Sequence, residues 1–263
     1  MKSYLYILGL YLFVFSSCSD PKTTLTDKIE QLTQELDKNQ SGTGRAELAA
    51  LQANFVDEFP NDSLSKSYLE NISFYYLMVD STSKAKKYAS QYVAQYPDDK
   101  NTNDIALVVA KAELKEQNYL AAIKAFEKVQ QNTMLSVSDT RLLGEALLAA
   151  SEDDDLEDRD MYYFKHAAVL EQTQGIQASI DALAQFQTLF PKSTIGPSVM
   201  MVYADKLGSA GDLAEAENVL NIIIKQYPDS PQAATAKTMI EKDLVGLSAD
   251  EQLKKILEDK STN

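Results

Sequence analysis

The sequence contains no tryptophan, one cysteine, one histidine and only nine glycines. A single cysteine excludes a scaffold built on intramolecular disulfides, so packing alone must hold the fold together. The sequence offers few residues for nucleophilic catalysis, because no serine stands in a G-x-S-x-G elbow. It also contains no glycine-rich loop that could bind a phosphate group. The sequence therefore predicts no catalytic residue, no cofactor and no metal, and a chain that is not an enzyme.

The long segments are filled by Ala, Leu, Lys, Glu and Gln, and 44% of the 263 residues are apolar. These residue types favour helices, whereas glycine, which disfavours helix interiors, is scarce. The composition predicts an all-α fold with a sizeable core. The formal net charge of -14 makes nucleic acid or an anionic lipid surface an unfavourable partner, because both would be repelled.

The N-terminus has the build of a secretory signal. An apolar run from Tyr4 to Phe15 follows one lysine, and it is too short to span a membrane. The sequence FSSC at residues 15–18 resembles the lipobox of bacterial lipoproteins of a Bacteroidetes-like envelope, which implies that residues 1–17 are removed and that Cys18 is lipidated. Ser19 resembles the pattern for outer-membrane delivery with the body facing the periplasm. An ordinary signal peptide with a cysteine nearby is the alternative, and a surface-exposed orientation stays open.

Four of the seven prolines directly follow an aromatic residue, in the pairs Phe59-Pro60, Tyr96-Pro97, Phe190-Pro191 and Tyr227-Pro228. Because the residue before a proline is pushed out of the α region, a helix should stop at each aromatic. Each aromatic also lies four residues after another large apolar residue, so the two share one helix face. The motif predicts the end of the second helix of a repeated two-helix unit.

Small residues recur at fixed distances before these prolines. Counting back twelve and twenty-four residues from Pro97, Pro191 and Pro228 always reaches Ala or Ser, and one unit without the proline fits the same frame. Antiparallel helices joined by a short turn can cross closely only where side chains are small. We therefore expect eight residues to be the packing positions of four helix pairs: Ser73, Ala85, Ala110, Ala122, Ala167, Ser179, Ala204 and Ala216.

This pattern resembles the tetratricopeptide repeat (TPR) over residues 45–246, most strongly in the last unit and in residues 103–131. The resemblance implies a TPR-like α-solenoid of antiparallel helix pairs, in which the first helix of each unit lines a concave groove that binds peptide segments. By analogy with the family, the partner-binding residues of that groove would be Glu70, Phe74, Leu107, Lys111, Met161, Phe164, Met201 and Asp205.

Three segments depart from the repeat frame. Residues 18–44 are expected to form a lipidated tether with a short amphipathic helix, whose apolar positions between 25 and 36 suggest a brief coiled-coil seam. A cap of the array made of residues 22–39 and 45–59 is the alternative. The units start 37, 57 and 37 residues apart, which predicts an insertion at about 135–159 with an extra helix near 138–150. Residues 247–263 begin with a capping box and are expected to cover the last apolar face.

Two features invite a chemical role. The loop at residues 152–160 holds seven carboxylates but lacks the glycine and the ligand spacing of a calcium loop. A solvated loop or a docking site for a basic partner is the better interpretation. His166 precedes Ala167 on a helix face that should be interior, which favours a structural imidazole over a catalytic one.

The leading hypothesis is a membrane-anchored, non-catalytic adaptor that binds and positions other envelope proteins or peptide segments in its concave groove. Tetratricopeptide lipoproteins of Gram-negative envelopes have this architecture. A lipoprotein that captures a glycan or small molecule for an outer-membrane transporter is the alternative: 14 tyrosines permit stacking on sugars, whereas the lack of tryptophan argues against it. A structural role through self-association is the third hypothesis. The identity of the partner and the oligomeric state do not follow from the sequence.

Overall fold

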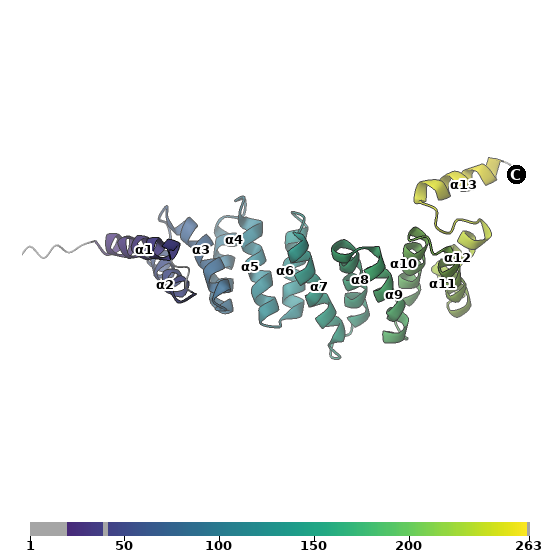
Figure 1. Ribbon diagram of the computed structural model, residues 1–263, viewed down its shortest axis with the longest axis horizontal. Coiled ribbons are helices and arrows are strands. Elements are labelled where there is room, and N and C mark those ends of the chain that lie inside the picture. The colour runs from purple at the N-terminus through teal and green to yellow at the C-terminus, as the bar shows by residue number, and fades with distance from the viewer. Residues whose placement is uncertain (1–19, 39–41, 262–263) are drawn as a thin grey trace, which may run out of the picture.

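The computed structural model describes residues 20–38 and 42–261, and in these residues the chain is a row of α-helices without a strand (Figure 1). The predicted signal peptide and Cys18 lie outside the described residues. The all-α prediction is confirmed, and the first twelve helices of the described part each pack on their neighbours in the chain, as in an α-solenoid. No helix of the described part is both long and apolar enough to cross a membrane. The thirteen helices of the described part are α1 (Pro21–Lys38), α2 (Gly42–Glu58), α3 (Ser65–Met78), α4 (Thr82–Gln95), α5 (Thr102–Lys115), α6 (Tyr119–Gln130), α7 (Val137–Glu152), α8 (Arg159–Gln174), α9 (Ile176–Leu189), α10 (Gly196–Ser209), α11 (Leu213–Gln226), α12 (Pro231–Glu241) and α13 (Ala249–Ser261).

The aromatic-proline pairs end helices, as predicted. α4, α9 and α11 stop one residue before Tyr96, Phe190 and Tyr227, whose φ values of -130°, -128° and -127° lie outside the helical range. Each of these aromatic amides still donates a hydrogen bond to the carbonyl four residues earlier, which closes the last turn. The rings pack in pairs along the helix face, with centroids 5.2 Å apart for Tyr92 and Tyr96 and 5.3 Å apart for Phe186 and Phe190.

The small residues of the repeat frame lie inside the array. All eight are 2% exposed or less, in pairs on α3 and α4, α5 and α6, α8 and α9, and α10 and α11, and each of these helix pairs packs together. Large apolar side chains around them form a series of clusters along the row, each shared by neighbouring helices. The core is therefore built stepwise along the solenoid.

The helix pattern repeats after five helices. α3 begins at Ser65 and α8 at Arg159, 94 residues later, and the starts of α4 and α9, α5 and α10, and α6 and α11 differ by the same 94 residues. α7 ends at Glu152, 94 residues after α2 ends at Glu58. α7 is therefore the counterpart of α2. Helices α2 to α6 form a first module, and helices α7 to α11 form a second module of the same design.

The segment expected to be an insertion at residues 135–159 is a regular part of the array, which corrects that interpretation. α7 packs against α6 on one side and against α8 on the other. It crosses α8 closely at Gly144, where an added Cβ would lie 2.7 Å from Cγ1 of Val169. His166 Nδ1, on α8, donates a 2.9 Å hydrogen bond to the Gly144 carbonyl. The long spacing between units arises because each module has an odd number of helices, which a frame of helix pairs cannot represent.

The first helix also belongs to the folded array, which agrees with the cap interpretation and corrects the prediction of a tether for residues 21–38. α1 packs along α2, and its Ile29 is 3% exposed in a cluster with Leu48 and Phe55. An ion pair between Lys22 and Asp62 adds a contact to the turn between α2 and α3. The apolar residues of α1 therefore pack against α2 of the same chain and do not form a coiled coil with another chain.

Two predicted helix caps are present near the C-terminal end. Ser230 Oγ accepts a 3.1 Å hydrogen bond from the Ala233 amide, and Pro231 takes the first position of α12. The Ser248 amide donates to the Glu251 carboxylate at 2.8 Å, which is one half of the predicted capping box before α13.

Helix α13 projects away from the row, as Figure 1 shows, so the prediction that it covers the last apolar face is wrong. Its Leu253 and Leu257 are each 57% exposed. The last face is closed by α12 itself, because the exposed positions of that helix between Ala234 and Glu241 carry small or polar side chains. Terminal helices of repeat arrays need such a polar outer face for solubility.

Candidate functional site

The apolar residues that the repeat family implies for a concave groove do not form one open surface. Phe74, Phe164 and Met201 are partly buried and pack against three different core clusters. Leu107 is 8% exposed and belongs to a cluster with residues of α6 and α7, so the prediction that it contacts a partner is wrong. Met161 is 36% exposed on the first turn of α8.

Two of the three charged residues in the same predicted set join helices to one another. Lys111 Nζ lies 2.7 Å from the Asp139 carboxylate, which links α5 to α7. Glu70 accepts a 3.0 Å hydrogen bond from Asn101 Nδ2, which links α3 to the start of α5. Asp205 is exposed on α10. Internal contacts therefore account for most of the predicted groove residues.

The face built by the first helices is also interrupted. In a superhelix, helices two apart in the chain touch along the inner side. Such contacts join α3 to α5 and α5 to α7, and then α10 to α12. The inner helices are thus α3, α5 and α7 in the N-terminal part of the array, and α10 and α12 near its C-terminal end. Because α7 changes this order, the first helices of the predicted pairs do not line one continuous groove within the described residues.

A groove of about 790 Å³ opens between α4 and α6, with α5 as its floor. This volume lies within the roughly 300–1,000 Å³ that ligand sites usually have. Much of the floor and walls is apolar, and Val93 on α4, Ala106 and Val109 on α5, and Ala125 and Val129 on α6 supply it, while Ser90 and Thr102 add hydroxyl groups. Apolar surface that water can reach in a hollow is suited to hold an apolar side chain of another molecule.

Polar side chains gather where the groove meets the turn between α4 and α5. Asp98 lies on that turn, Asn103 on the first turn of α5, and Lys128 and Asn132 at the end of α6. Asp98 and Lys128 are exposed and make no ion pair among the described residues. The mouth of the groove therefore presents the Asp98 carboxylate on the turn between α4 and α5 and the Lys128 ammonium group on α6.

Two positions that line the groove carry alanine in the first module. Ala106 and Ala125 correspond, 94 residues later, to Met200 and Val219, which are 8% and 3% exposed in the core of the second module. The larger side chains fill the space that the alanines leave open. Reasoning from the sequence missed this site. A comparison of the two modules at an offset of 94 residues would have found it.

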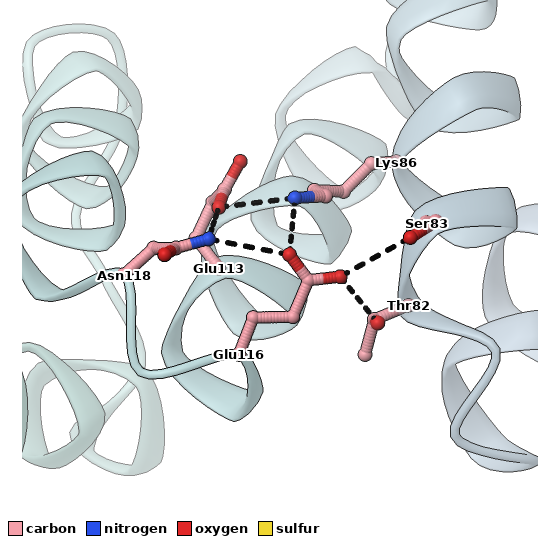
Figure 2. A network of polar contacts seen from close by, with 6 residues as sticks. All are labelled: Thr82, Ser83, Lys86, Glu113, Glu116 and Asn118. Carbon is pink, nitrogen blue, oxygen red and sulfur yellow. Dashed lines mark hydrogen bonds and ion pairs between the residues drawn. The ribbon is translucent and has the colours of Figure 1, made fainter.

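A polar network fixes the angle between α4 and α5 at the end away from the mouth (Figure 2). Lys86 Nζ lies 3.1 Å from the Glu113 carboxylate and also contacts Glu116. Asn118 donates a 2.8 Å hydrogen bond to Glu113, and Thr82 donates to Glu116. The hydrogen bond to Glu116 raises the pKa of Lys86, and the same bond lowers the pKa of Glu116. Both groups therefore stay charged at neutral pH.

A second network holds the turn at the mouth. The Asp99 carboxylate binds Lys66 of α3, accepts a 2.8 Å hydrogen bond from the Tyr92 hydroxyl and accepts a 2.9 Å hydrogen bond from the Asn101 amide. The Lys66 ammonium, together with these donors, lowers the pKa of Asp99 well below its usual range. Asp99 is thus occupied by contacts within the fold, which leaves Asp98 as the unpaired carboxylate among the described residues that line the groove.

The other features singled out in the sequence carry structural contacts. Burial lowers the pKa of the His166 imidazole, and its hydrogen bond to Gly144 opposes this in part, so the ring is neutral at pH 7. In the acidic loop, Arg159 pairs with Asp154, and Asp160 accepts a hydrogen bond from Ser193 at 2.5 Å. Within the part of the chain that the structure describes, no three His, Cys, Asp or Glu side chains are placed to hold a metal ion.

Comparison with known proteins supports the repeat type. Residues 203–230, which contain the end of α10 and all of α11, match the family model described as tetratricopeptide repeat. The match falls on the last predicted unit, where the resemblance in the sequence is strongest. The search of curated protein sequences found no match. The fold is a TPR-like α-solenoid.

The solved structures to which this chain is similar include several repeat proteins. The repeats of a putative kinesin light chain from Podosopora anserina are 15% identical, cover 84% of this chain and 99% of that chain, and give a TM-score of 0.34. The TPR2AB domain of yeast Sti1 in a complex with pHSP90 is 13% identical, with 82% and 97% covered and a TM-score of 0.33. Yeast Tom70 is 16% identical, with 91% and 59% covered and a TM-score of 0.30. What this chain binds has to be inferred from its own surface.

Proposed function

We propose that this chain is a non-catalytic adaptor of the cell envelope, which holds other envelope proteins on its helical array. A lipid on Cys18 anchors it to the outer membrane with the array in the periplasm. The observation that carries the binding role is the groove between α4 and α6, because its apolar floor is open to a partner and its mouth keeps Asp98 and Lys128 unpaired. The two polar networks hold α4 and α5 in place, so the groove is largely pre-formed.

The anchor rests on the sequence FSSC at residues 15–18 and on the apolar run before it. Each buried methylene of an acyl chain contributes about 0.8 kcal/mol, so several chains on one cysteine make attachment effectively permanent. Cys18→Ala should abolish incorporation of labelled palmitate and move the protein from the membrane fraction to the soluble fraction. Ser17→Ala keeps a small residue before the cysteine and serves as the control, which should still be labelled. Unchanged labelling of the Cys18 variant would remove the anchor from the proposal.

The binding role is tested by site-specific photo-crosslinking in cells. A benzoyl-phenylalanine at Ala94, an exposed residue on the groove wall, should yield an adduct of defined mass with an envelope protein. The same group at Ala214, an exposed alanine on α11, is the matched control and should not yield this adduct. If no protein adduct forms at Ala94 and an oligosaccharide strongly stabilises the purified protein against heat, the adaptor role falls and ligand capture replaces it.

A further inference from the structure

In the second module, the chain plugs its own groove with an aromatic ring. Tyr227, which follows the end of α11, accepts a 2.9 Å hydrogen bond from Gln187 Nε2 on α9. Its hydroxyl oxygen also lies 3.3 Å from the position that a Cβ on Gly196 of α10 would take. The ring therefore fills the space between the end of α9, the start of α10 and the end of α11, and it packs against the core of that module.

The first module lacks this plug. The counterparts of Tyr227, Gln187 and Gly196, 94 residues earlier, are Thr133, Val93 and Thr102. Val93 and Thr102 line the groove between α4 and α6, whereas Thr133 is exposed on the turn after α6. The next residue, Met134, stands where the second module has a proline, and it is 93% exposed. Neither Thr133 nor Met134 therefore fills the groove, and Asn132 of the same turn only lines its mouth.

The shape and charge of the groove define what fits there. The place that an aromatic ring takes in the second module is lined in the first by Val93 in place of an amide, so a ring without a hydroxyl matches it better. Asp98 at the mouth has no ion-pair partner among the described residues, and the chain carries a net charge of -14. Lys128 is also exposed at this mouth, but the chain as a whole is strongly negative, so the balance of charge favours a basic segment. A second copy of this chain would bring the same negative charge and is disfavoured as the occupant.

We infer that the groove between α4 and α6 takes a phenylalanine side chain from a basic segment of a partner protein, which occupies the place that Tyr227 fills in the second module. This inference rests on the proposed adaptor role and names the chemistry of its partner. Burial of an aromatic anchor in an apolar pocket is the usual source of most of the affinity of such a contact, and the surrounding charges select the partner.

The test uses the full-length protein and a capped heptapeptide, Gly-Lys-Ala-Phe-Ala-Lys-Gly, with binding followed by fluorescence anisotropy. Methyl NMR of the valines locates the site. The peptide should shift the methyl signals of Val93, Val109 and Val129. A peptide with alanine in place of phenylalanine should bind at least about tenfold more weakly. A peptide with glutamate in place of both lysines should also bind more weakly, because Asp98 would then face a like charge.

Two variants fill the groove by different routes. Ala106→Met introduces the side chain that the second module has at Met200, and Thr133→Tyr with Met134→Pro introduces its aromatic-proline plug. Each should weaken binding of the phenylalanine peptide about tenfold. Ala214→Met, an exposed position on α11, is the matched control and should bind normally. Circular dichroism of each variant shows that the fold is retained.

The inference is overturned if the phenylalanine and alanine peptides bind equally, if Ala106→Met leaves the affinity unchanged, or if the methyl shifts lie outside the groove. Its failure is distinguishable from failure of the adaptor role. A protein adduct at Ala94 that survives the groove-filling variants keeps the adaptor role and removes the aromatic anchor. Peptide binding in the groove without any protein adduct in cells keeps the site and removes the adaptor role.

Discussion

The crossing of α7 and α8 gives the sharpest test of the packing, because it depends on a residue without a side chain. A Cβ added to Gly144 would lie 2.7 Å from Cγ1 of Val169, whereas ordinary contacts begin at 3.4 Å. The two helices would have to separate locally by about 0.7 Å, the difference between these distances. Val169 cannot easily turn away, since it is 7% exposed and a β-branched side chain has one strongly preferred rotamer in a helix.

Gly144→Ala therefore sets two effects against each other. Removing a glycine from a helix interior stabilises the helix by up to about 1 kcal/mol. Overpacking a tight contact costs about 1–3 kcal/mol. The net expectation is a loss of about 1 kcal/mol, which lowers the melting temperature by about 2–4 °C for a chain of this size. Gly42→Ala is the matched control, because a Cβ there meets nothing within 4 Å, and it should cause no loss.

Thermal and urea unfolding of Gly144→Ala, Val169→Ala and the double variant would measure the contact directly. Val169→Ala removes the methyl group that the new Cβ meets, so the double variant should be more stable than the sum of the single effects predicts, by about 1 kcal/mol. The reasoning is refuted if Gly144→Ala is as stable as the unaltered protein, or if the two substitutions add without coupling.

Three further predictions follow from single residues. Ala122→Leu, at a position with no exposure, should cost about 1–3 kcal/mol in urea unfolding, whereas Ala121→Leu on the exposed face of the same helix should stay within about 0.5 kcal/mol. Because burial lowers the pKa of His166, the folded protein binds the proton less well than the unfolded chain. Stability should be full above the usual histidine pKa of about 6.5 and fall as the pH drops below it, and His166→Gln should reduce this slope in melts from pH 7.5 to 5. The Lys66 ammonium lowers the pKa of Asp99, so its contribution is present above the usual aspartate pKa of about 3.9 and is lost on further acidification. Asp99→Asn should lower the melting temperature at pH 7 and reduce the fall of the melting temperature at acid pH. An unchanged fall at acid pH would contradict a stabilising role of the charged Asp99.

Local rules in the sequence were sufficient for the fold class and the helix ends. A proline restricts the residue before it whatever the tertiary context, so Tyr96 and Tyr227 could be assigned as the ends of helices from the sequence alone. Small residues at a constant spacing indicate close helix crossings for a similarly local reason, and Ala85 and Ala216 are fully buried.

Features that depend on which helices become neighbours could not be predicted in this way. α7 carries no aromatic-proline ending, and the frame of two-helix units left it as an insertion, although it packs on α6 and α8 like any other helix. The groove was missed because alanine at positions 106 and 125 looks like any other packing residue until the counterpart helices show methionine and valine there. Lys111 and Glu70 were assigned to a partner by analogy with the repeat family, and that analogy could not show that their ion pair and hydrogen bond reach across to other helices.

The odd number of helices in each module has a consequence for how the array can be used. Successive antiparallel helices alternate between two sides of a solenoid, so a period of five moves each helix to the side opposite its counterpart. The second-neighbour contacts agree, since they involve α3, α5 and α7 and then α10 and α12. The open groove floored by α5 and the plugged groove floored by α10 therefore face opposite sides of the array. A partner that docks on the first module finds no second copy of the groove beside it, so binding by the aromatic anchor should be one-to-one. A stoichiometry of two peptides per chain in isothermal titration would contradict this arrangement.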